Sequence, residues 1–182
     1  MKMSVIARLS AVTLLALALA APLHAQERRG FVVGSVGGAN LGHADSEMGD
    51  AAIFGGAVGV HLTPRLVVEL DVHHAGVSHV FGRAHHDFTQ TTLTPSLLFR
   101  SSPQGRVHLL AGGGIGFQRA HTEVDDPQFV IDRTEAIRMW HGRGGVDWDV
   151  SPRVFIRTEG VLWFGAGLDW VVGGRGGIGF RF

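Results

Sequence analysis

The sequence predicts an all-β fold in which eight antiparallel strands follow one another in up-and-down order and close into a barrel. Three observations predict it. Apolar and polar residues alternate with a period of two in eight successive segments. Tight turns that contain Pro or Gly alternate with longer polar connections. The N-terminus has the layout of an export signal, which directs the domain out of the cytoplasm.

Residues 1–25 are predicted to be a signal peptide. Two basic residues open the chain, an apolar run follows over residues 9–21, and the small residue Ala25 stands just after it. The run is shorter than the roughly 20 apolar residues of a spanning helix. We expect cleavage after Ala25, which leaves one domain over residues 26–182; an uncleaved anchor is the alternative.

Composition limits what this domain can do. The chain has no Cys, so disulfide bonds and thiol chemistry are excluded. Its 16 basic and 16 acidic residues balance, and a nucleic-acid partner would require a basic face. The 27 Gly without low complexity suit crowded strands. No apolar stretch after the leader is long enough for a membrane helix, so a membrane could be crossed only by strands.

The period-two pattern places each strand in turn. The first strand, near residues 31–39, has an ambiguous register. The others are expected near residues 53–62, 65–75, 94–100, 106–118, 140–150, 154–164 and 168–182. At about 9–11 residues, such strands can cross a bilayer when tilted.

The connections alternate in length. Thr63-Pro64, residues 101–105 and Ser151-Pro152 are tight turns. Longer connections are expected at residues 40–50, 76–87 and 120–134, and a short one at residues 165–167. Tight turns on the periplasmic side and longer loops outside are typical of an outer-membrane barrel, and an even number of strands puts both termini in the periplasm.

Most strands have one apolar and one charged face. Leu66, Val68 and Leu70 lie on the face opposite Glu69 and Asp71, for example. A soluble barrel would bury the apolar face, whereas a membrane barrel turns it toward lipid, and alternation alone does not separate these two cases. A soluble periplasmic ligand-binding barrel is therefore kept as an alternative.

Two features favour the membrane. Trp170 and Phe180 share a face and are separated by a distance of about 25 Å along the bilayer normal, which is the height of the apolar band between aromatic girdles. The basic residues opposite the apolar faces are Arg and never Lys, and Arg pairs with carboxylates in closed interiors. We therefore predict a transmembrane β-barrel in the outer membrane of a Gram-negative bacterium.

The charged faces would then fill the lumen. An eight-stranded barrel is just wide enough for its own side chains, which argues against a general porin. Trp163 also falls on the lumen face, which suggests a local bulge or a wrong register. The predicted lumen charge network consists of Glu69, Asp71, Arg143, Asp147, Arg157, Glu159, Arg175 and Arg181.

The chain ends on an aromatic strand in which Ile178, Phe180 and Phe182 share one face. With the leader, the size and the eight-strand rhythm, this strand resembles the small outer-membrane β-barrel family of OmpA and OmpX type, over nearly all of the mature chain. The resemblance implies that the barrel-assembly machinery reads these three residues during insertion. The chain differs from the family in having no Tyr, the usual girdle residue.

The predicted role is structural, adhesive or ligand-binding, without catalysis and without a cofactor. The expected partners are outer-membrane lipid, the assembly machinery and an external ligand that contacts the loops at 40–50, 76–87 and 120–134. A lipid-modifying enzyme is the alternative. Ser78-His79 is the only adjacent Ser-His pair, and no acid stands where a catalytic triad would need one.

Residues 73–87 are rich in His, which is a common ligand of Zn²⁺, Cu²⁺ and Ni²⁺. His79, His85 and His86 are the candidate ligands. Their spacing is not diagnostic, and adjacent residues of a strand point to opposite faces. A polar external loop is therefore the preferred interpretation over a metal site.

Overall fold

The computed structural model describes residues 30–40, 50–81, 84–101, 104–126, 129–165 and 168–182. The predicted signal peptide and most of the predicted loop at 40–50 lie outside these residues. The strands are β1 (Gly30–Asn40), β2 (Asp50–His61), β3 (Leu66–Phe81), β4 (Ala84–Arg100), β5 (Val107–Asp126), β6 (Phe129–Asp149), β7 (Val154–Gly165) and β8 (Leu168–Arg181).

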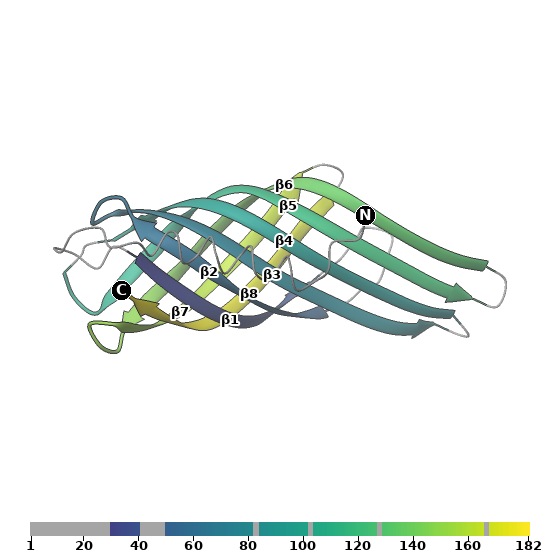
Figure 1. Cartoon of the computed structure of the whole chain (residues 1–182), viewed down its shortest axis with the longest axis horizontal. Helices are drawn as coiled ribbons and strands as arrows, with labels where there is room; N and C mark the ends of the chain where they lie inside the picture. Colours follow the sequence, from purple (N-terminus) through teal and green to yellow (C-terminus); the bar gives the residue numbers. More distant parts are fainter. Residues whose placement is uncertain (1–29, 41–49, 82–83, 102–103, 127–128, 166–167) are drawn as a thin grey trace.

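Consecutive strands pair in sequence order and form one closed barrel (Figure 1). The barrel closes where β1 pairs antiparallel with β8, from Phe31↔Arg181 to Asn40↔Val172. The predicted eight-stranded antiparallel up-and-down barrel is thus confirmed. The described part of the chain has no helix with the length and hydropathy that a membrane span requires.

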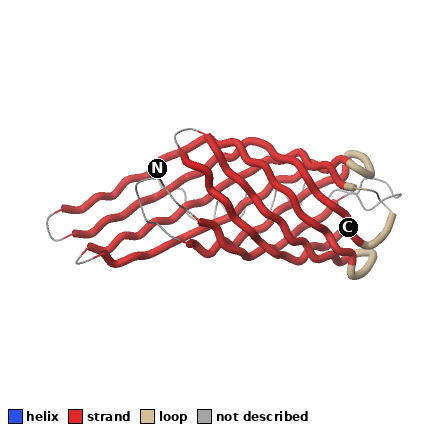
Figure 2. The backbone as a smooth tube through the Cα atoms, turned by 180° about the vertical axis from the view of Figure 1, so that it is seen from behind, coloured by secondary structure: helices blue, strands red, loops and turns tan. Residues whose placement is uncertain are grey.

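Two of the three predicted long loops are largely strand, which corrects the sequence-based interpretation. β3 continues to Phe81 and β4 starts at Ala84, while β5 and β6 stay paired as far as Asp126↔Phe129. These four strands extend beyond the other four at one end of the barrel (Figure 2). Beyond the apolar band, water can solvate both faces of a sheet, so the alternation disappears from the sequence while the backbone ladder continues.

Two of the tight turns at the opposite end are stabilised by the same side-chain to backbone hydrogen bonds. In the turn after β2, the Thr63 side-chain oxygen accepts hydrogen bonds from the backbone N–H groups of Arg65 and Leu66. In the turn after β6, the Ser151 oxygen does the same for Arg153 and Val154. A Ser or Thr that caps its own turn in this way lets the chain reverse without a long loop.

The packing is inside-out relative to a soluble protein. Large apolar side chains on the outer face are exposed, among them Leu109 at 61% and Ile178 at 67%, while Glu69 and Asp71 are each 1% exposed. The predicted polarity of the strands is therefore confirmed. The burial pattern also determines the register of the first strand, in which Phe31 and Val33 point inward and Val32 outward.

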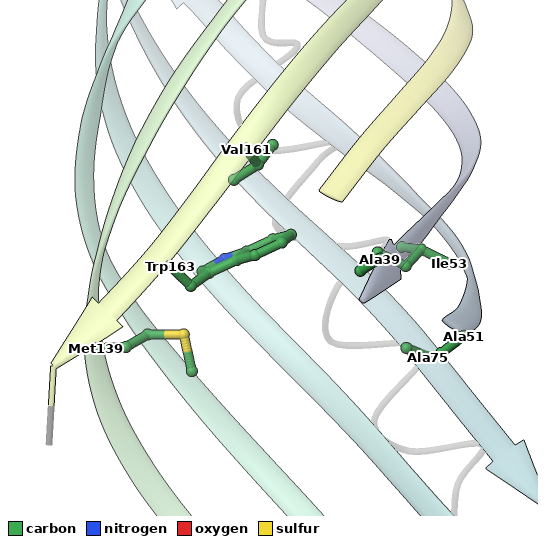
Figure 3. Close-up of a cluster of buried hydrophobic side chains, with 7 residues drawn as sticks. All are labelled: Ala39, Ala51, Ile53, Ala75, Met139, Val161 and Trp163. Carbon is green, nitrogen blue, oxygen red and sulfur yellow. The ribbon is translucent and has the colours of Figure 1, made fainter. Parts of the chain in front are cut away.

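Two apolar clusters occupy the lumen besides the charges. One lies toward the tight turns and consists of Phe31, Val33, Ala57, Val67, Leu98 and Phe155. The other lies toward the extended strands, where Trp163 packs with Met139, Val161, Ile53 and three Ala side chains (Figure 3). Trp163 points inward in regular register with His141, and the bulge comes after it, between Trp163 and Gly165.

Candidate functional site

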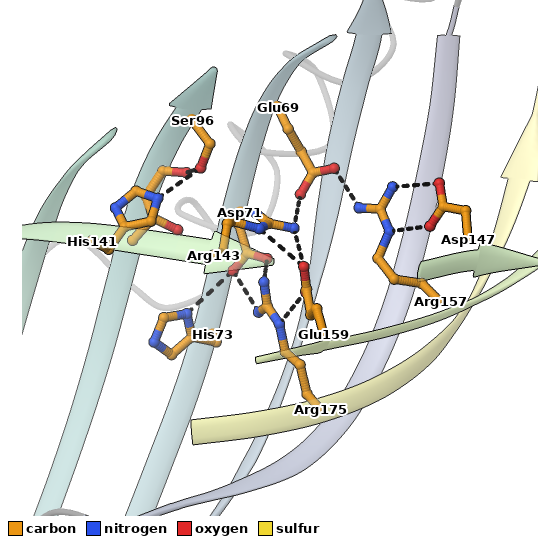
Figure 4. A network of polar contacts seen from close by, with 11 residues as sticks. Glu69, Asp71, His73, Ser96, His141, Arg143, Asp147, Arg157, Glu159 and Arg175 are labelled. Carbon is orange, nitrogen blue, oxygen red and sulfur yellow. Dashed lines mark hydrogen bonds and ion pairs between the residues drawn. The ribbon is translucent and has the colours of Figure 1, made fainter. Parts of the chain in front are cut away.

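Two features of this barrel are candidates for function: the charged lumen and the projecting sheet, which we define as residues 77–81, 84–90, 118–126 and 129–139 of β3 to β6. The eight predicted network residues all have buried side chains, with exposures of 9% or less. They come from only four strands, β3, β6, β7 and β8. Figure 4 shows seven of them meeting in the middle of the barrel.

Arg157 on β7 is the most connected member. Its Nε and Nη2 donate to the two carboxylate oxygens of Asp147 at 2.7 and 3.1 Å. Its Nη1 donates to Oε2 of Glu69 at 2.5 Å. This two-pronged contact with Asp147 matches the planar guanidinium to a planar carboxylate, which a Lys could not do.

Arg143 and Arg175 continue the network around Glu159. The Nε of Arg143 donates to Oε2 of Glu159 at 2.9 Å, and the Nε of Arg175 donates to Oε1 at 2.5 Å. Arg143 also forms an ion pair with Glu69 at 2.6 Å, and Arg175 donates to Asp71 at 2.9 Å. Glu69 and Glu159 thus each lie between two guanidinium groups, as buried charges require.

Arg181 is not part of this central group. It donates to Oδ1 of Asp149 at 2.6 Å, nearer the tight turns, and its guanidinium lies 4.4 Å from the centre of the Phe155 ring. His108 and Arg100 also contact Asp149, with closest approaches of 3.1 and 3.8 Å. The period-two pattern puts Arg100, His108 and Asp149 on polar faces, but these three residues were left out of the predicted network.

A buried Ser–His contact was also missed from the sequence. The Ser96 hydroxyl lies 2.8 Å from Nε2 of His141, although the two residues are on β4 and β6. Gly114 of β5 pairs with both and has no side chain to separate them. The Nδ1 of His141 has no hydrogen-bond partner among the described residues, so no acid completes a triad here.

On the projecting sheet, two of the three candidate metal ligands lie on facing positions of neighbouring strands. His79 and His86 are cross-strand partners, and His85 lies on the other face of β4. The side chain of His79 is outside the described part. Among the side chains that are described, there is no group of three His, Cys, Asp or Glu residues that could hold a metal ion.

Ser78 was considered as a nucleophile, and its neighbours can now be named. Its hydroxyl lies 3.4 Å from Nε2 of His85, and Asp87 approaches that same nitrogen at 3.3 Å. A catalytic triad uses the two ring nitrogens separately, one for the hydroxyl and one for the acid. The observed contacts are instead those of an exposed polar surface.

The predicted assembly residues Ile178, Phe180 and Phe182 are exposed on the outer face. Phe182 exchanges two backbone hydrogen bonds with Gly30, at 3.0 and 3.3 Å. The last residue of the chain therefore pairs with the first residue of β1 and helps to close the barrel. The side chain of Trp170, the second residue of the predicted girdle pair, is outside the described part.

The sequence matches the outer membrane protein beta-barrel domain family over residues 10–160. The chain belongs to this family. No curated protein matches the sequence significantly. As a member of the family, the chain is an integral β-barrel of the outer membrane, in agreement with its exposed apolar faces. The soluble periplasmic alternative is thereby set aside.

Solved outer-membrane proteins share the fold at low sequence identity. Neisserial surface protein A has a TM-score of 0.67 at 13% identity, with 87% of this chain and 100% of that chain covered. Ail, the attachment invasion locus protein of Yersinia pestis, has a TM-score of 0.63 at 15% identity, covering 84% and 97%. The N-terminal barrel of Pseudomonas aeruginosa OprF has a TM-score of 0.58 at 14% identity, covering 86% and 100%.

Proposed function

We propose that this barrel acts through its projecting sheet, which binds an external ligand or surface, and that the lumen network stabilises the barrel. The observation that carries the proposal is the difference in strand length. β3 to β6 have 16, 17, 20 and 21 residues, whereas the other strands have 11 to 14. About 9–11 residues suffice to cross the bilayer, so the excess lies beyond it.

The lumen offers little support for transport as the main task. Ion pairs connect β3 with β6, β7 and β8 across the interior, and apolar clusters pack at both ends of the network. Eight strands leave an interior just wide enough for such side chains. A network of this kind holds the wall together and fills the interior, which argues against a wide aqueous path.

The chemistry of the projecting sheet suits binding. Exposed side chains of both signs lie on it, including Arg119, Arg133 and Arg138 beside Glu123 and Asp132. Ail has been solved in complex with the heparin analogue sucrose octasulfate. By analogy, a sulfated glycan is a reasonable first probe for this protein, whose exposed Arg side chains could contact sulfate groups.

Assembly in the membrane follows the family pattern in this proposal. Cleavage of residues 1–25 releases the barrel domain over residues 26–182, and the barrel-assembly machinery recognises Ile178, Phe180 and Phe182. We propose no catalytic role. The lipid-modifying alternative predicts loss of an acyl chain from lipid A on overexpression, which mass spectrometry of extracted lipid A measures.

Attachment of cells to heparin-coated and albumin-coated glass tests the binding role. The variant to compare has both projecting hairpins shortened to the barrel rim by removal of residues 78–87 and 121–134 with a short Gly-containing turn in each place. It should keep the heat-dependent gel shift of a folded barrel and lose attachment. Unchanged attachment of a folded, shortened variant would contradict the proposal.

A further inference from the structure

The projecting sheet has a long open edge on β6. From Phe129 to Met139, β6 pairs with β5 on one side, and its pairing with β7 starts only at Trp140↔Phe164. Within the described residues, no strand covers the other side of this 11-residue segment. Unpaired edges are templates for strand addition, and natural proteins usually keep them short, charged or covered.

The backbone groups at this edge can be assigned. Asp149 donates its N–H to the carbonyl of Arg106, so odd-numbered residues of β6 bond to β5. The pairing of β5 with β6 has no register shift, which preserves this alternation along the whole strand. The residues that present N–H and C=O groups to the open edge are therefore Val130, Asp132, Thr134, Ala136 and Arg138.

We propose that the partner of this edge is the same edge of a second copy. The two strands run antiparallel and are related by a two-fold axis at Thr134, so that Thr134 of one copy lies opposite Thr134 of the other. In that register Arg133 of each copy lies opposite Glu135 of the other, so the two-fold symmetry gives two equivalent Arg–Glu pairs. Both side chains are exposed, at 73% and 42%, and they already form an ion pair within one chain. The inference rests on the proposed role of the projecting sheet and names one partner for it.

Charge selects this register over its neighbours. Moving the two-fold axis by one residue places Arg133 opposite Arg133, or Glu135 opposite Glu135, and like charges directly opposite destabilise strand pairs. About Thr134, the edge-facing residues pair with one another and form about ten backbone hydrogen bonds. Two four-stranded projecting sheets then join into one continuous sheet.

The antiparallel arrangement also determines where the second copy sits. Two barrels in one membrane are related by an axis along its normal, so their β6 strands cross the membrane in the same sense and cannot run antiparallel. The strands are antiparallel only when the two barrels face each other from opposed membranes. The pairing therefore tethers neighbouring vesicles or cells that carry this protein.

Vesicle tethering with charge variants tests this pairing. Purified protein is reconstituted into phospholipid vesicles, and clustering is followed by light scattering. Wild-type vesicles should cluster, whereas Arg133→Glu vesicles and Glu135→Arg vesicles, each alone, should cluster roughly tenfold less or worse. Mixing the two variants should restore clustering. The Arg133→Glu protein has acidic side chains at positions 133 and 135, and the Glu135→Arg protein has basic side chains at both, so the facing pairs again have opposite charges. Equal clustering of every sample, or no recovery on mixing, would overturn the proposal.

A cysteine cross-link tests the register. The natural chain has no Cys, so Thr134→Cys introduces a single thiol. Hydrogen-bonded antiparallel partners have Cα atoms about 5.5 Å apart, within disulfide range. Oxidised Thr134→Cys vesicles should give a covalent dimer. Ala136→Cys is the matched control, because Ala136 of one copy lies opposite Asp132 of the other and is far from Ala136 of the other copy. Cross-linking of the control alone, or of neither folded variant, would contradict the register.

The two proposals can fail separately. Glu135→Arg keeps the length of the projecting sheet and all three of its named Arg side chains, so this variant should still attach to heparin-coated glass if that sheet binds external ligands. Loss of clustering with normal attachment supports self-pairing as a distinct property. Clustering that persists in the hairpin-shortened variant would overturn self-pairing, while the attachment assay decides the wider role.

Discussion

Arg157 on β7 donates a hydrogen bond of 2.5 Å to Glu69 on β3, directly across the lumen. The two strands are four positions apart in a ring of eight, so they lie on opposite sides of the barrel. No backbone ladder connects them, and this contact is one of those that tie one wall to the other. Because both groups are buried, removal of either takes one ion-pair partner away from charges that stay in the lumen, where water cannot replace it.

Replacing Glu69 with Ala should therefore destabilise the barrel. We expect the free energy of unfolding to fall by about 3–5 kcal/mol, because Arg143 and Arg157 both lose a carboxylate. The urea midpoint in detergent measures it. Glu123→Ala, at an exposed site on the projecting sheet, is the matched control and should change little. An equal midpoint for the two variants would refute the structural role of the network.

Gly179→Ala should disturb the apolar cluster near the tight turns. A Cβ at this position would lie 2.1 Å from Cζ of Phe155, whose side chain is fully buried. Displacing that ring should cost about 1–3 kcal/mol. Gly34→Ala is the control, because a Cβ there would meet nothing within 4 Å. Urea titration of the pair should separate them; equal midpoints would mean that Phe155 has room to move.

Removal of Phe182 should slow assembly more than it affects the finished barrel. The residue contributes two terminal hydrogen bonds to Gly30 and an exposed ring, which is a small part of the closed structure. In a cell, we expect less folded protein in the outer membrane and more in the periplasm, measured by fractionation and heat-dependent gel mobility. Phe164→Ala, also exposed on the outer face, controls for loss of an aromatic ring. Equal yields of the two variants would argue against a role of Phe182 in recognition.

Ion conduction should be small in planar bilayers. The lumen holds Arg157, Arg143 and Arg175 in contact with four carboxylates and is packed with apolar side chains on either side of them. We expect no steady open channel of porin size. Conductance steps like those of a wide porin from wild-type protein would contradict the filled lumen, and heat-denatured protein serves as the blank.

The strands and their faces could be predicted because burial in a barrel follows a period of two. Glu69, Asp71 and Arg157 were assigned to the interior from this period together with the features that favour a membrane barrel. Their partners could not be assigned, because contacts across the lumen depend on the stagger of strands that are not neighbours. Ser96 and His141 meet only because Gly114 between them lacks a side chain. No local pattern reveals such a contact.

Two further features show how far the period-two pattern reaches. It placed Trp163 on the lumen face, where the side chain is 6% exposed, and the suspected irregularity follows it, between Trp163 and Gly165. The outer parts of β3 to β6 look like loops because no lipid covers their outer face, which can therefore be polar, although inward side chains such as Ala120 and Val124 stay buried at 7%. Val77 and Phe88, which pack against the Trp163 cluster, are among the apolar residues of these extensions.

Tryptophan quenching by brominated lipid tests the inside-out packing most directly. Three variants, each with one Trp retained at position 140, 148 or 163 and the other Trp residues replaced by Phe, are reconstituted in bilayers. Trp140 and Trp148 are each 57% exposed on the outer face, whereas Trp163 is 6% exposed in the lumen. Bromine should quench the fluorescence of the first two strongly and that of Trp163 weakly. Strong quenching of Trp163 with little effect on Trp140 and Trp148 would contradict the account.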